Sequence, residues 1–242
     1  MNIALIFAGG KGTRMKASLP KQFLKINGKP ILFHTLDLFQ NHEDIDKIYI
    51  STIDEWIPYV KKHVEKGQYS KVVDVIGGGD SAQDTIYRLL VRASEENSGD
   101  SIVLLHDGVR PFVEKKVITN NIEGVKKNGN AITSVPAYET IMVSEDHDVV
   151  DSVTIRDNTF LGQAPQSFYL KDILDAHNKI RNSANGYKNM VDACTIIRTL
   201  GMKAHLVDGN RGNLKITTPE DVYTFKAYLQ LKEDKETFGI DR

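Results

Sequence analysis

The residues best suited to chemistry stand near the beginning of the chain, where a glycine turn is followed by a series of cations. The stretch Leu5–Pro30 reads LIFAGGKGTRMKASLPKQFLKINGKP and contains no acidic residue. Backbone N–H groups of a glycine turn can close on an anion, and arginine and lysine side chains supply the counter-charge. Arg14 can grip phosphate oxygens in a bidentate manner, while Lys21 acts as a compact point charge. The pattern predicts a site for phosphate groups.

Two well-known phosphate loops do not match this stretch. The dinucleotide pattern G-x-G-x-x-G fits Gly10 and Gly12 but fails at Met15, which counts against a nicotinamide-dependent oxidoreductase. The Walker pattern requires G-K-[ST], whereas Lys11 is followed by Gly12. A solvated turn with lysines in water is the alternative that the local sequence leaves open.

The overall composition shows that the excess of positive charge is confined to the stretch near the beginning of the chain. The chain has 242 residues, with 31 Lys and Arg against 32 Asp and Glu, so no net charge attracts nucleic acid or an anionic membrane. A single cysteine, Cys194, excludes an intramolecular disulfide and a cysteine cluster for zinc. No apolar run is long enough to span a membrane, and the first residues lead into a strand rather than a signal peptide. We expect a cytoplasmic protein.

The elements that must position these cations alternate between strands and helices. We expect strands at 3–8, 46–52, 71–76 and 101–107, and helices at 30–40, 56–66, 85–93, 168–180, 189–200 and 219–231. Strands that are apolar on both faces and separated by helices are typical of a parallel sheet wrapped by helices. No linker or repeat interrupts the chain, so a single α/β domain over residues 1–242 is favoured.

One segment departs from this alternation. Residues 135–158 contain two short alternating runs, ETIMV and VVDSVTI, joined by the charged turn SEDHD. This pattern predicts a β-hairpin that leaves the main body as an arm.

Ligands of open α/β sheets bind beyond the carboxyl ends of the strands. That rule selects four segments: Gly9–Lys21, Gly77–Thr85, His106–Arg110 and, if a last short strand joins the sheet, the segment around Asn213–Lys215. Asp107 directly follows a predicted strand and has the chemistry of a Mg²⁺ ligand or of a turn residue. We interpret His106 as structural.

An ordered set of motifs then gives the chain a specific resemblance. AGGKGTRM, LPKQFL, GGGDSAQDTI, HDGVRPF, YETI, TIRDN, GQAPQSF, VDAC and GNLKIT follow one another along nearly its whole length. The chain resembles the cytidylyltransferases that act on 2-C-methyl-D-erythritol 4-phosphate or ribitol 5-phosphate. The resemblance implies a Rossmann-like nucleotidyltransferase that joins a polyol phosphate to CTP and releases pyrophosphate with the help of Mg²⁺.

The resemblance also implies roles for individual residues. By this resemblance, the catalytic residues are Arg14, Lys21 and Lys215, and the metal ligand is Asp107. CTP binding falls to Ala8, Gly9, Gly10, Gly12, Thr13, Gly79, Asp80, Thr85 and Arg110. The second substrate falls to Thr140, Arg156 and Asp192, although a capping aspartate at a helix start explains Asp192 equally well. In the family the hairpin reaches a partner subunit, which implies a homodimer whose sites Thr140 and Arg156 complete in trans.

Several residues depart from the family pattern. Ala82 stands where arginine is usual, and Thr85 where serine is commoner. Gly212 stands where erythritol-type enzymes have an acidic residue, and Ala164 where threonine is usual. VRPF, GQAPQSF and DAC look more like the ribitol-type enzymes of teichoic-acid or capsule synthesis, so we favour ribitol 5-phosphate. An erythritol phosphate substrate, and a catalytically silent nucleotide-binding protein, remain as alternatives.

Overall fold

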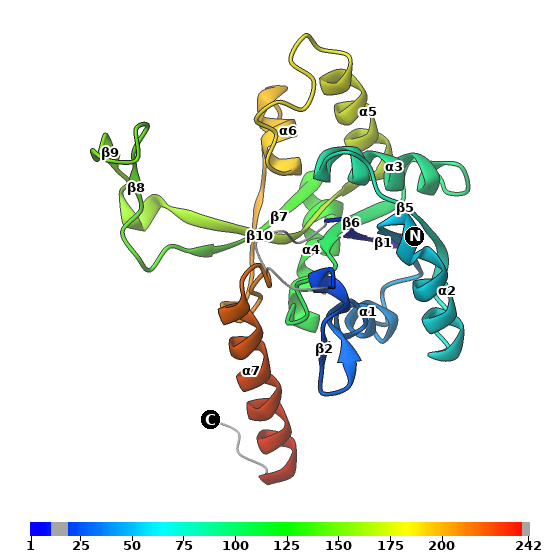
Figure 1. Cartoon of the computed structure of the whole chain (residues 1–242). Helices are drawn as coiled ribbons and strands as arrows, with labels where there is room; N and C mark the ends of the chain where they lie inside the picture. The colour runs from blue at the N-terminus through cyan, green and yellow to red at the C-terminus, as the bar shows by residue number, and fades with distance from the viewer. Residues whose placement is uncertain (11–18, 239–242) are drawn as a thin grey trace.

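A central sheet dominates the computed structural model, which describes residues 1–10 and 19–238 (Figure 1). Its strand order is β11-β7-β10-β6-β1-β4-β5. The strands are β1 Asn2–Ala8, β4 Lys47–Thr52, β5 Val72–Gly77, β6 Ile102–Asp107, β7 Asn130–Pro136, β10 Phe160–Tyr169 and β11 Leu206–Asp208. All neighbouring strands pair in parallel except β10, which runs antiparallel to both β6 and β7. The predicted α/β class with a mostly parallel sheet is confirmed.

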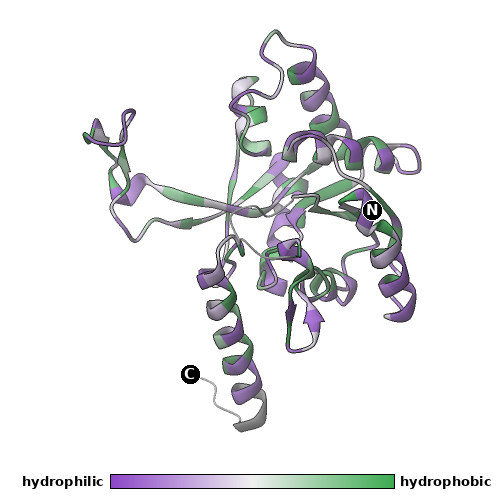
Figure 2. Ribbon diagram, viewed as in Figure 1, coloured by the Kyte–Doolittle hydropathy of each residue, from purple (hydrophilic) through white to green (hydrophobic). Residues whose placement is uncertain are grey.

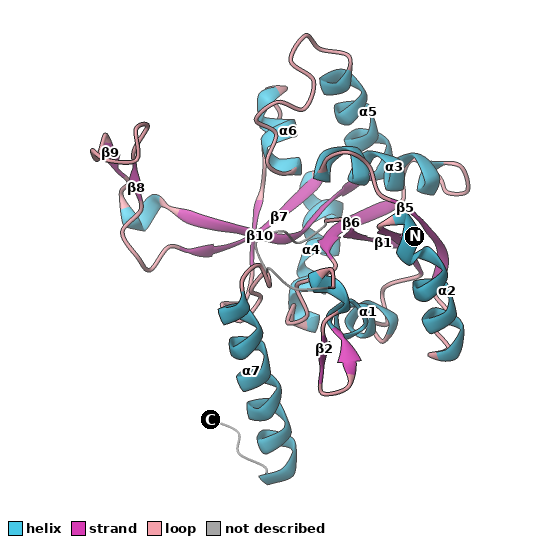
Figure 3. Ribbon diagram, in the orientation of Figure 1, coloured by secondary structure: helices cyan, strands magenta, loops and turns pink. Residues whose placement is uncertain are grey.

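Helices cover both faces of this sheet (Figure 3). Alternate side chains of β1 divide between two cores, because successive residues of a strand point to opposite faces. Ala4 and Ile6 lie in the core beneath α1 Ile31–Gln40, α2 Ile57–Lys66 and α4 Lys115–Asn128. Ile3 and Leu5 lie in the core beneath α3 Ala82–Ser94, α5 Leu170–Arg181 and α6 Ala193–Thr199. The helices show an apolar face toward the sheet and a polar face toward solvent (Figure 2).

The register of the sheet aligns the carboxyl ends of four strands. Phe7 is paired with Asp107, Ala8 with Thr52, and Thr52 with Gly77. The loops that follow β1, β5 and β6 therefore begin at one edge of the sheet. These are three of the four segments that the sequence selected.

Some elements differ from the expected ones. Strands β7 and β10 and helix α4 were not predicted, and the helix expected from residue 168 begins at Leu170. Phe168 instead lies in β10, where it is buried in the core with α5. The last strand of the sheet is β11, so Asn213–Lys215 lies in a loop rather than in a strand.

The predicted hairpin is present and leaves the body as an arm (Figure 1). The ends of β7 and β10 form its root, with Phe160 paired to Pro136. Its tip is the two-stranded pair β8 Met142–Val143 and β9 Ser152–Val153, which is shorter than the sequence suggested. The arm exposes apolar side chains, including Met142 at 60%, Ile155 at 70% and Phe160 at 46%.

The last helix, α7 Pro219–Phe238, begins at the predicted proline and extends away from the sheet (Figure 1). Phe225 anchors its first half in a small core with Ile26, Ile31, Val109 and Ile216. Within the described residues, no helix is long and apolar enough to cross a membrane.

Candidate active site

The carboxyl ends of β1, β5 and β6 open onto a cavity of about 630 Å³. Lys21 and Lys215 contribute cations to its lining, and Asp80 and Asp107 contribute carboxylates. The rest of the lining includes backbone of Gly9, Gly10 and Gly79 and the small residues Ala8, Ser81, Ala82 and Thr85. The volume lies within the range of small-molecule sites, and its lining offers the N–H groups and cations that suit phosphates.

The turn after β1 is held from behind by Gln22, a residue that the sequence analysis did not single out. The buried amide of Gln22 donates to the carbonyl oxygens of Ala8, at 2.6 Å, and Gly10, at 3.1 Å. Gln22 lies in the 3-10 helix η2 Lys21–Phe23, whose Phe23 ring stacks on Trp56 at 4.1 Å. These contacts fix the backbone that carries Lys21. In the sequence, the polar Gln22 between Lys21 and the apolar Phe23 was the feature from which this supporting role could have been predicted.

The glycine loop after β5 forms the opposite wall. The N–H of Gly79 donates to Thr85 Oγ1 at 2.9 Å, and the Thr85 hydroxyl donates to Ser81 O at 2.9 Å. A Cβ on Gly9 would lie 3.3 Å from Thr85 Oγ1, so the two glycine turns meet over this hydroxyl. Thr85 therefore shapes the cavity wall, and Ser81 and Ala82 place the N-terminus of α3 at the cavity. A helix N-terminus favours negative charge.

Asp107, at the end of β6, joins two distant parts of the chain. Its Oδ1 lies 2.6 Å from Lys215 Nζ, and its Oδ2 accepts from Arg110 Nε at 2.9 Å. Burial raises the pKa of Asp107, but the charges and hydrogen bonds of Lys215 and Arg110 outweigh burial and hold that pKa below its usual value. The carboxylate is therefore ionised at neutral pH and balanced by two cations.

The loop that carries Lys215 is fixed by amides that the sequence analysis also missed. Arg110 Nη1 donates to Asn213 O at 2.8 Å, and the buried Asn213 side chain donates to Ala164 O at 2.6 Å. Gln163 Nε2 donates to Asn210 O at 3.1 Å. Both amides lie inside motifs that carried the resemblance, GQAPQSF and GNLKIT. Their contribution is to bring β10 and the Lys215 loop together.

His106 supports this region from the core, as interpreted. Its Nε2 lies 3.1 Å from the Arg110 carbonyl oxygen, and its ring packs on Phe39. Burial lowers the pKa of His106 to about 4. The neutral ring donates to the carbonyl of Arg110 and so helps fix the turn that carries this arginine.

A second cavity, of about 250 Å³, adjoins the first and shares Ala82, Asp107 and Lys215 with it. Arg110 and Asp192 also line it. Asp192 Oδ1 caps α6 by accepting from the Thr195 N–H at 2.7 Å, and its Oδ2 accepts from Gln166 at 2.8 Å. Asp192 thus has the capping function that the sequence left open, beside the cavity where a substrate contact was predicted.

The remaining predicted residues lie elsewhere. Thr140 and Arg156 are brought together on the arm, where Arg156 Nη2 donates to Thr140 Oγ1 at 3.2 Å. Neither lines either of the two cavities described above. Gly12, Thr13 and Arg14 fall outside the described residues.

Cations and glycine N–H groups at the carboxyl ends of a mostly parallel sheet are typical of α/β proteins that bind phosphate groups. Comparison with known proteins gives the family. The protein-family model described as 2-C-methyl-D-erythritol 4-phosphate cytidylyltransferase matches residues 2–231, and the chain belongs to that family.

Curated relatives cover the full length. A ribitol-5-phosphate cytidylyltransferase of Vibrio parahaemolyticus serotype O3:K6 is 42% identical over 240 residues, covering 99% of this chain and 100% of the relative. One of Streptococcus agalactiae serotype V is 40% identical, with the same coverage. A 2-C-methyl-D-erythritol 4-phosphate cytidylyltransferase of Geotalea uraniireducens is 39% identical over 228 residues, covering 94% of this chain and 96% of the relative.

Solved structures share the fold. The 4-diphosphocytidyl-2C-methyl-D-erythritol synthase of Anaerococcus prevotii has a TM-score of 0.81 at 28% identity, covering 95% of this chain and 96% of that one. The 2-C-methyl-D-erythritol 4-phosphate cytidylyltransferase of Francisella tularensis has a TM-score of 0.77 at 28% identity, covering 93% and 98%.

Proposed function

We propose that this protein transfers the cytidylyl group of CTP to D-ribitol 5-phosphate, giving CDP-ribitol and pyrophosphate. The observation that carries the proposal is the identity of 40–42% with ribitol-5-phosphate cytidylyltransferases over 99% of the chain. The cavity supports it, because cations and backbone N–H groups surround a space large enough for a nucleotide. A 2-C-methyl-D-erythritol 4-phosphate substrate is the second candidate, favoured by the family model and by relatives at 35–39% identity.

The chemistry is an in-line displacement at the α-phosphorus of CTP. An oxygen of the polyol phosphate forms a bond to this phosphorus, while the bond to the oxygen that bridges to the β-phosphorus breaks and pyrophosphate leaves. The attacking phosphate is already ionised at neutral pH, so the reaction requires no protein nucleophile. Catalysis then depends on positioning and on stabilising charge in the transition state.

The cavity lining supports the following assignment of these tasks to particular residues. Gly9 and Gly10 lie in the cavity lining, where their N–H groups would meet phosphate oxygens, and Gly79 and Asp80 lie in the same lining, where they would border cytosine and ribose. Lys21 and Lys215 lie in the same lining and neutralise charge on the reacting phosphates. Arg110 hydrogen-bonds both to Asp107 and to the loop that carries Lys215, and so fixes the position of Lys215 relative to Asp107.

A divalent cation would be held through Asp107, whose Oδ1 and Oδ2 pair with Lys215 and Arg110 but each keep a second lone pair for a metal. Mg²⁺ is usually held by one or two carboxylates together with phosphate oxygens and water, and Asp107 supplies one ionised carboxylate in the cavity lining. Among residues 1–10 and 19–238, no three acidic, histidine or cysteine side chains are grouped so that they could hold a metal ion. In the proposed site, phosphate oxygens of CTP and water would complete the coordination. When bound, Mg²⁺ would neutralise phosphate charge and orient the triphosphate.

The arm supports the further proposal of a homodimer. Its two-stranded tip exposes large apolar side chains, and isolated hairpins are marginally stable in water. Packing on a second subunit would cover these side chains. It would also carry Thr140 and Arg156 to the partner's cavity, where a guanidinium and a hydroxyl suit the polyol phosphate.

The test is pyrophosphate release with CTP and a panel of phosphates. We expect turnover with ribitol 5-phosphate and a kcat/KM at least tenfold lower with 2-C-methyl-D-erythritol 4-phosphate. The reverse order would move the assignment to the second candidate. Absence of turnover with every phosphate, in a protein that still binds CTP, would indicate the catalytically silent alternative.

A further inference from the structure

The outer side of the glycine loop after β5 carries a contact that the proposed reaction does not use. Arg88 Nη1 donates to the carbonyl oxygen of Gly78 at 2.7 Å. The N–H of Gly78 donates to Thr52 O at 2.7 Å. Hydrogen bonds therefore hold both the N–H and the carbonyl group of Gly78. A Cβ on Gly78 would lie 3.3 Å from the Cα of Gly9. Displacement of Gly78 would therefore disturb the contact between the glycine loop after β5 and the glycine turn after β1, which form two walls of the cavity.

Arg88 is itself held by Asp84. Its Nε donates to Asp84 Oδ2 at 3.2 Å, so one guanidinium group links the carboxylate to the loop carbonyl. The Asp84 carboxylate also fills the space beside Gly79, where a Cβ would lie 2.0 Å from Oδ2. The side chain of Asp84 is 20% exposed, which limits its screening by water.

A second arginine reaches Asp84 from another part of the chain. Arg181, the last residue of α5, donates from Nη1 to Asp84 Oδ1 at 2.6 Å. Its guanidinium carbon lies 4.0 Å from the centre of the Tyr87 ring, which fixes the guanidinium plane. Both oxygens of Asp84 are therefore occupied, one by each arginine.

We propose that Arg88 and Arg181, acting through Asp84, are positioning residues that hold the glycine walls of the cavity in the form that binds CTP. Neither arginine lines either of the cavities described above. Ala82, which lines the cavity, has no polar side-chain atom, and the guanidinium contact to the loop comes from Arg88. The inference rests on the proposed function, since it takes CTP as the ligand of this cavity.

Because the network acts on the nucleotide wall, its loss should weaken CTP binding without changing the chemical step. In Arg88→Met and in Arg181→Met we expect the KM for CTP to rise about five- to tenfold, because only part of the free energy of the lost charge-assisted hydrogen bond reaches CTP binding through the loop. We expect kcat and the KM for the polyol phosphate to stay within twofold of wild type. Arg88→Lys, which keeps one donor, should give an intermediate KM. In the double variant the rise should be smaller than the product of the single effects, because both arginines act through one carboxylate.

The matched control is Arg198→Met. Arg198 also donates from Nη1 to a backbone carbonyl, that of Met202, at 2.8 Å, but lines neither cavity. We expect all its kinetic constants to match wild type. Calorimetric titration with CTP and the thermal midpoint of each variant separate binding from global stability.

Hydrogen exchange gives a readout that does not depend on turnover. Amides of residues 77–79 should exchange faster in Arg88→Met and Arg181→Met than in Arg198→Met. If loop exchange and CTP affinity are unchanged in both variants, or if kcat falls as much as affinity, the positioning proposal is wrong. Wild-type protein that neither binds CTP nor releases pyrophosphate would instead defeat the proposed function, while the exchange data would still show whether the arginines hold the loop.

Discussion

At the scale of single residues, the pairing of Asp107 with Lys215 prepares the site for a charged substrate. Lys215 Nζ lies 2.6 Å from Asp107 Oδ1, and Arg110 Nε pairs with Asp107 Oδ2. An ammonium group has three donors, so Lys215 can keep Asp107 and still donate to a phosphate oxygen. The structure therefore presents a cation whose position is fixed before CTP arrives.

Removal of either cavity lysine should affect rate more than stability. We expect Lys21→Ala and Lys215→Ala each to lower kcat by about 10²–10³, because each lysine contributes charge that the transition state requires. The measurement is pyrophosphate release at saturating CTP and ribitol 5-phosphate, with Lys62→Ala, an exposed change on α2, as the control. Near-normal kcat in both variants would remove these lysines from the catalytic group.

The metal proposal makes Asp107 sensitive to loss of charge at constant shape. We expect Mg²⁺-dependent activity, abolished by EDTA, and a loss of at least tenfold in kcat/KM for Asp107→Asn that excess Mg²⁺ does not fully restore. The amide also loses the ion pairs with Lys215 and Arg110, so thermal midpoints must accompany the Mg²⁺ titration. A variant that matches wild type at every Mg²⁺ concentration would make Asp107 structural.

His177 should make the fold less stable in weak acid. It is fully buried, with Nδ1 2.6 Å from the Tyr187 hydroxyl, and burial followed by the charge of Arg181 lowers its pKa to about 4. The unfolded chain binds a proton near pH 6.5, whereas the folded chain does not until about pH 4. Stability should therefore fall as pH decreases across this window.

The expected loss from His177 between pH 7.5 and pH 5 is about 2 kcal/mol. Urea unfolding at both pH values should show that His177→Gln removes this part of the slope. The remainder includes His106, whose pKa burial also lowers to about 4. His147→Gln, on the exposed arm, is the control. Equal slopes in wild type and His177→Gln would contradict the linkage.

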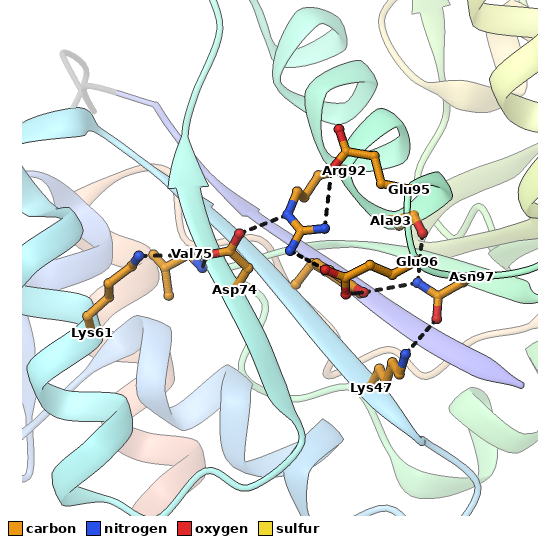
Figure 4. A network of polar contacts seen from close by, with 10 residues as sticks. Lys47, Lys61, Asp74, Val75, Arg92, Ala93, Glu95, Glu96 and Asn97 are labelled. Atoms are coloured by element: carbon orange, nitrogen blue, oxygen red, sulfur yellow. Dashed lines mark hydrogen bonds and ion pairs between the residues drawn. The ribbon is translucent and has the colours of Figure 1, made fainter.

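At the scale of elements, an ion-pair network secures the edge of the sheet (Figure 4). Asp74 on β5 accepts from Arg92 of α3 at 2.9 Å and lies 3.7 Å from Lys61 of α2. Arg92 also donates to Glu96 at 2.6 Å. The network thus connects β5 to the helices on both faces, and β5 carries the glycine loop at its end.

Truncation of Arg92 should loosen this edge. We expect Arg92→Met to lower the free energy of unfolding by about 1–2 kcal/mol, because a partly buried charged hydrogen bond to Asp74 is lost. The exposed pair Lys126–Glu123 gives the control, since Lys126→Met should leave the free energy of unfolding nearly unchanged. Denaturant titration measures both. Equal effects of the two changes would show that the Arg92 network adds no stability to the edge.

At the scale of the whole molecule, the arm and the cavity are separate in one chain, and the proposed dimer would join them. We expect a dimer by analytical ultracentrifugation. Lys21→Ala and Arg156→Ala homodimers should both be inactive. A mixed dimer would have one site with both changes and one with neither, so activity should recover to about one quarter of wild type after random subunit exchange of equal amounts. A monomer, or no recovery after exchange is confirmed by mass spectrometry, would defeat the shared-site proposal.

The local features of this protein follow from patterns among residues that are near one another in the sequence. Apolar runs between turn signals located β1, β4 and β6, and the end of β6 located Asp107, because strand periodicity and glycine turns act between near neighbours. The interruption of the alternation located the arm. The regular apolar positions of α4, such as Val117, Ile122 and Val125, were also available, although this helix was not predicted.

The contacts between distant segments depend on the packing of the folded chain. The insertion of β10 between β6 and β7 depends on pairing across long loops, which no local pattern encodes. The ion pair of Asp107 with Lys215, and the amides of Gln22, Asn213 and Gln163 that hold the cavity walls, arise from the same packing. A polar residue shows its partner only when burial forces it to find one, and burial is a property of the folded chain.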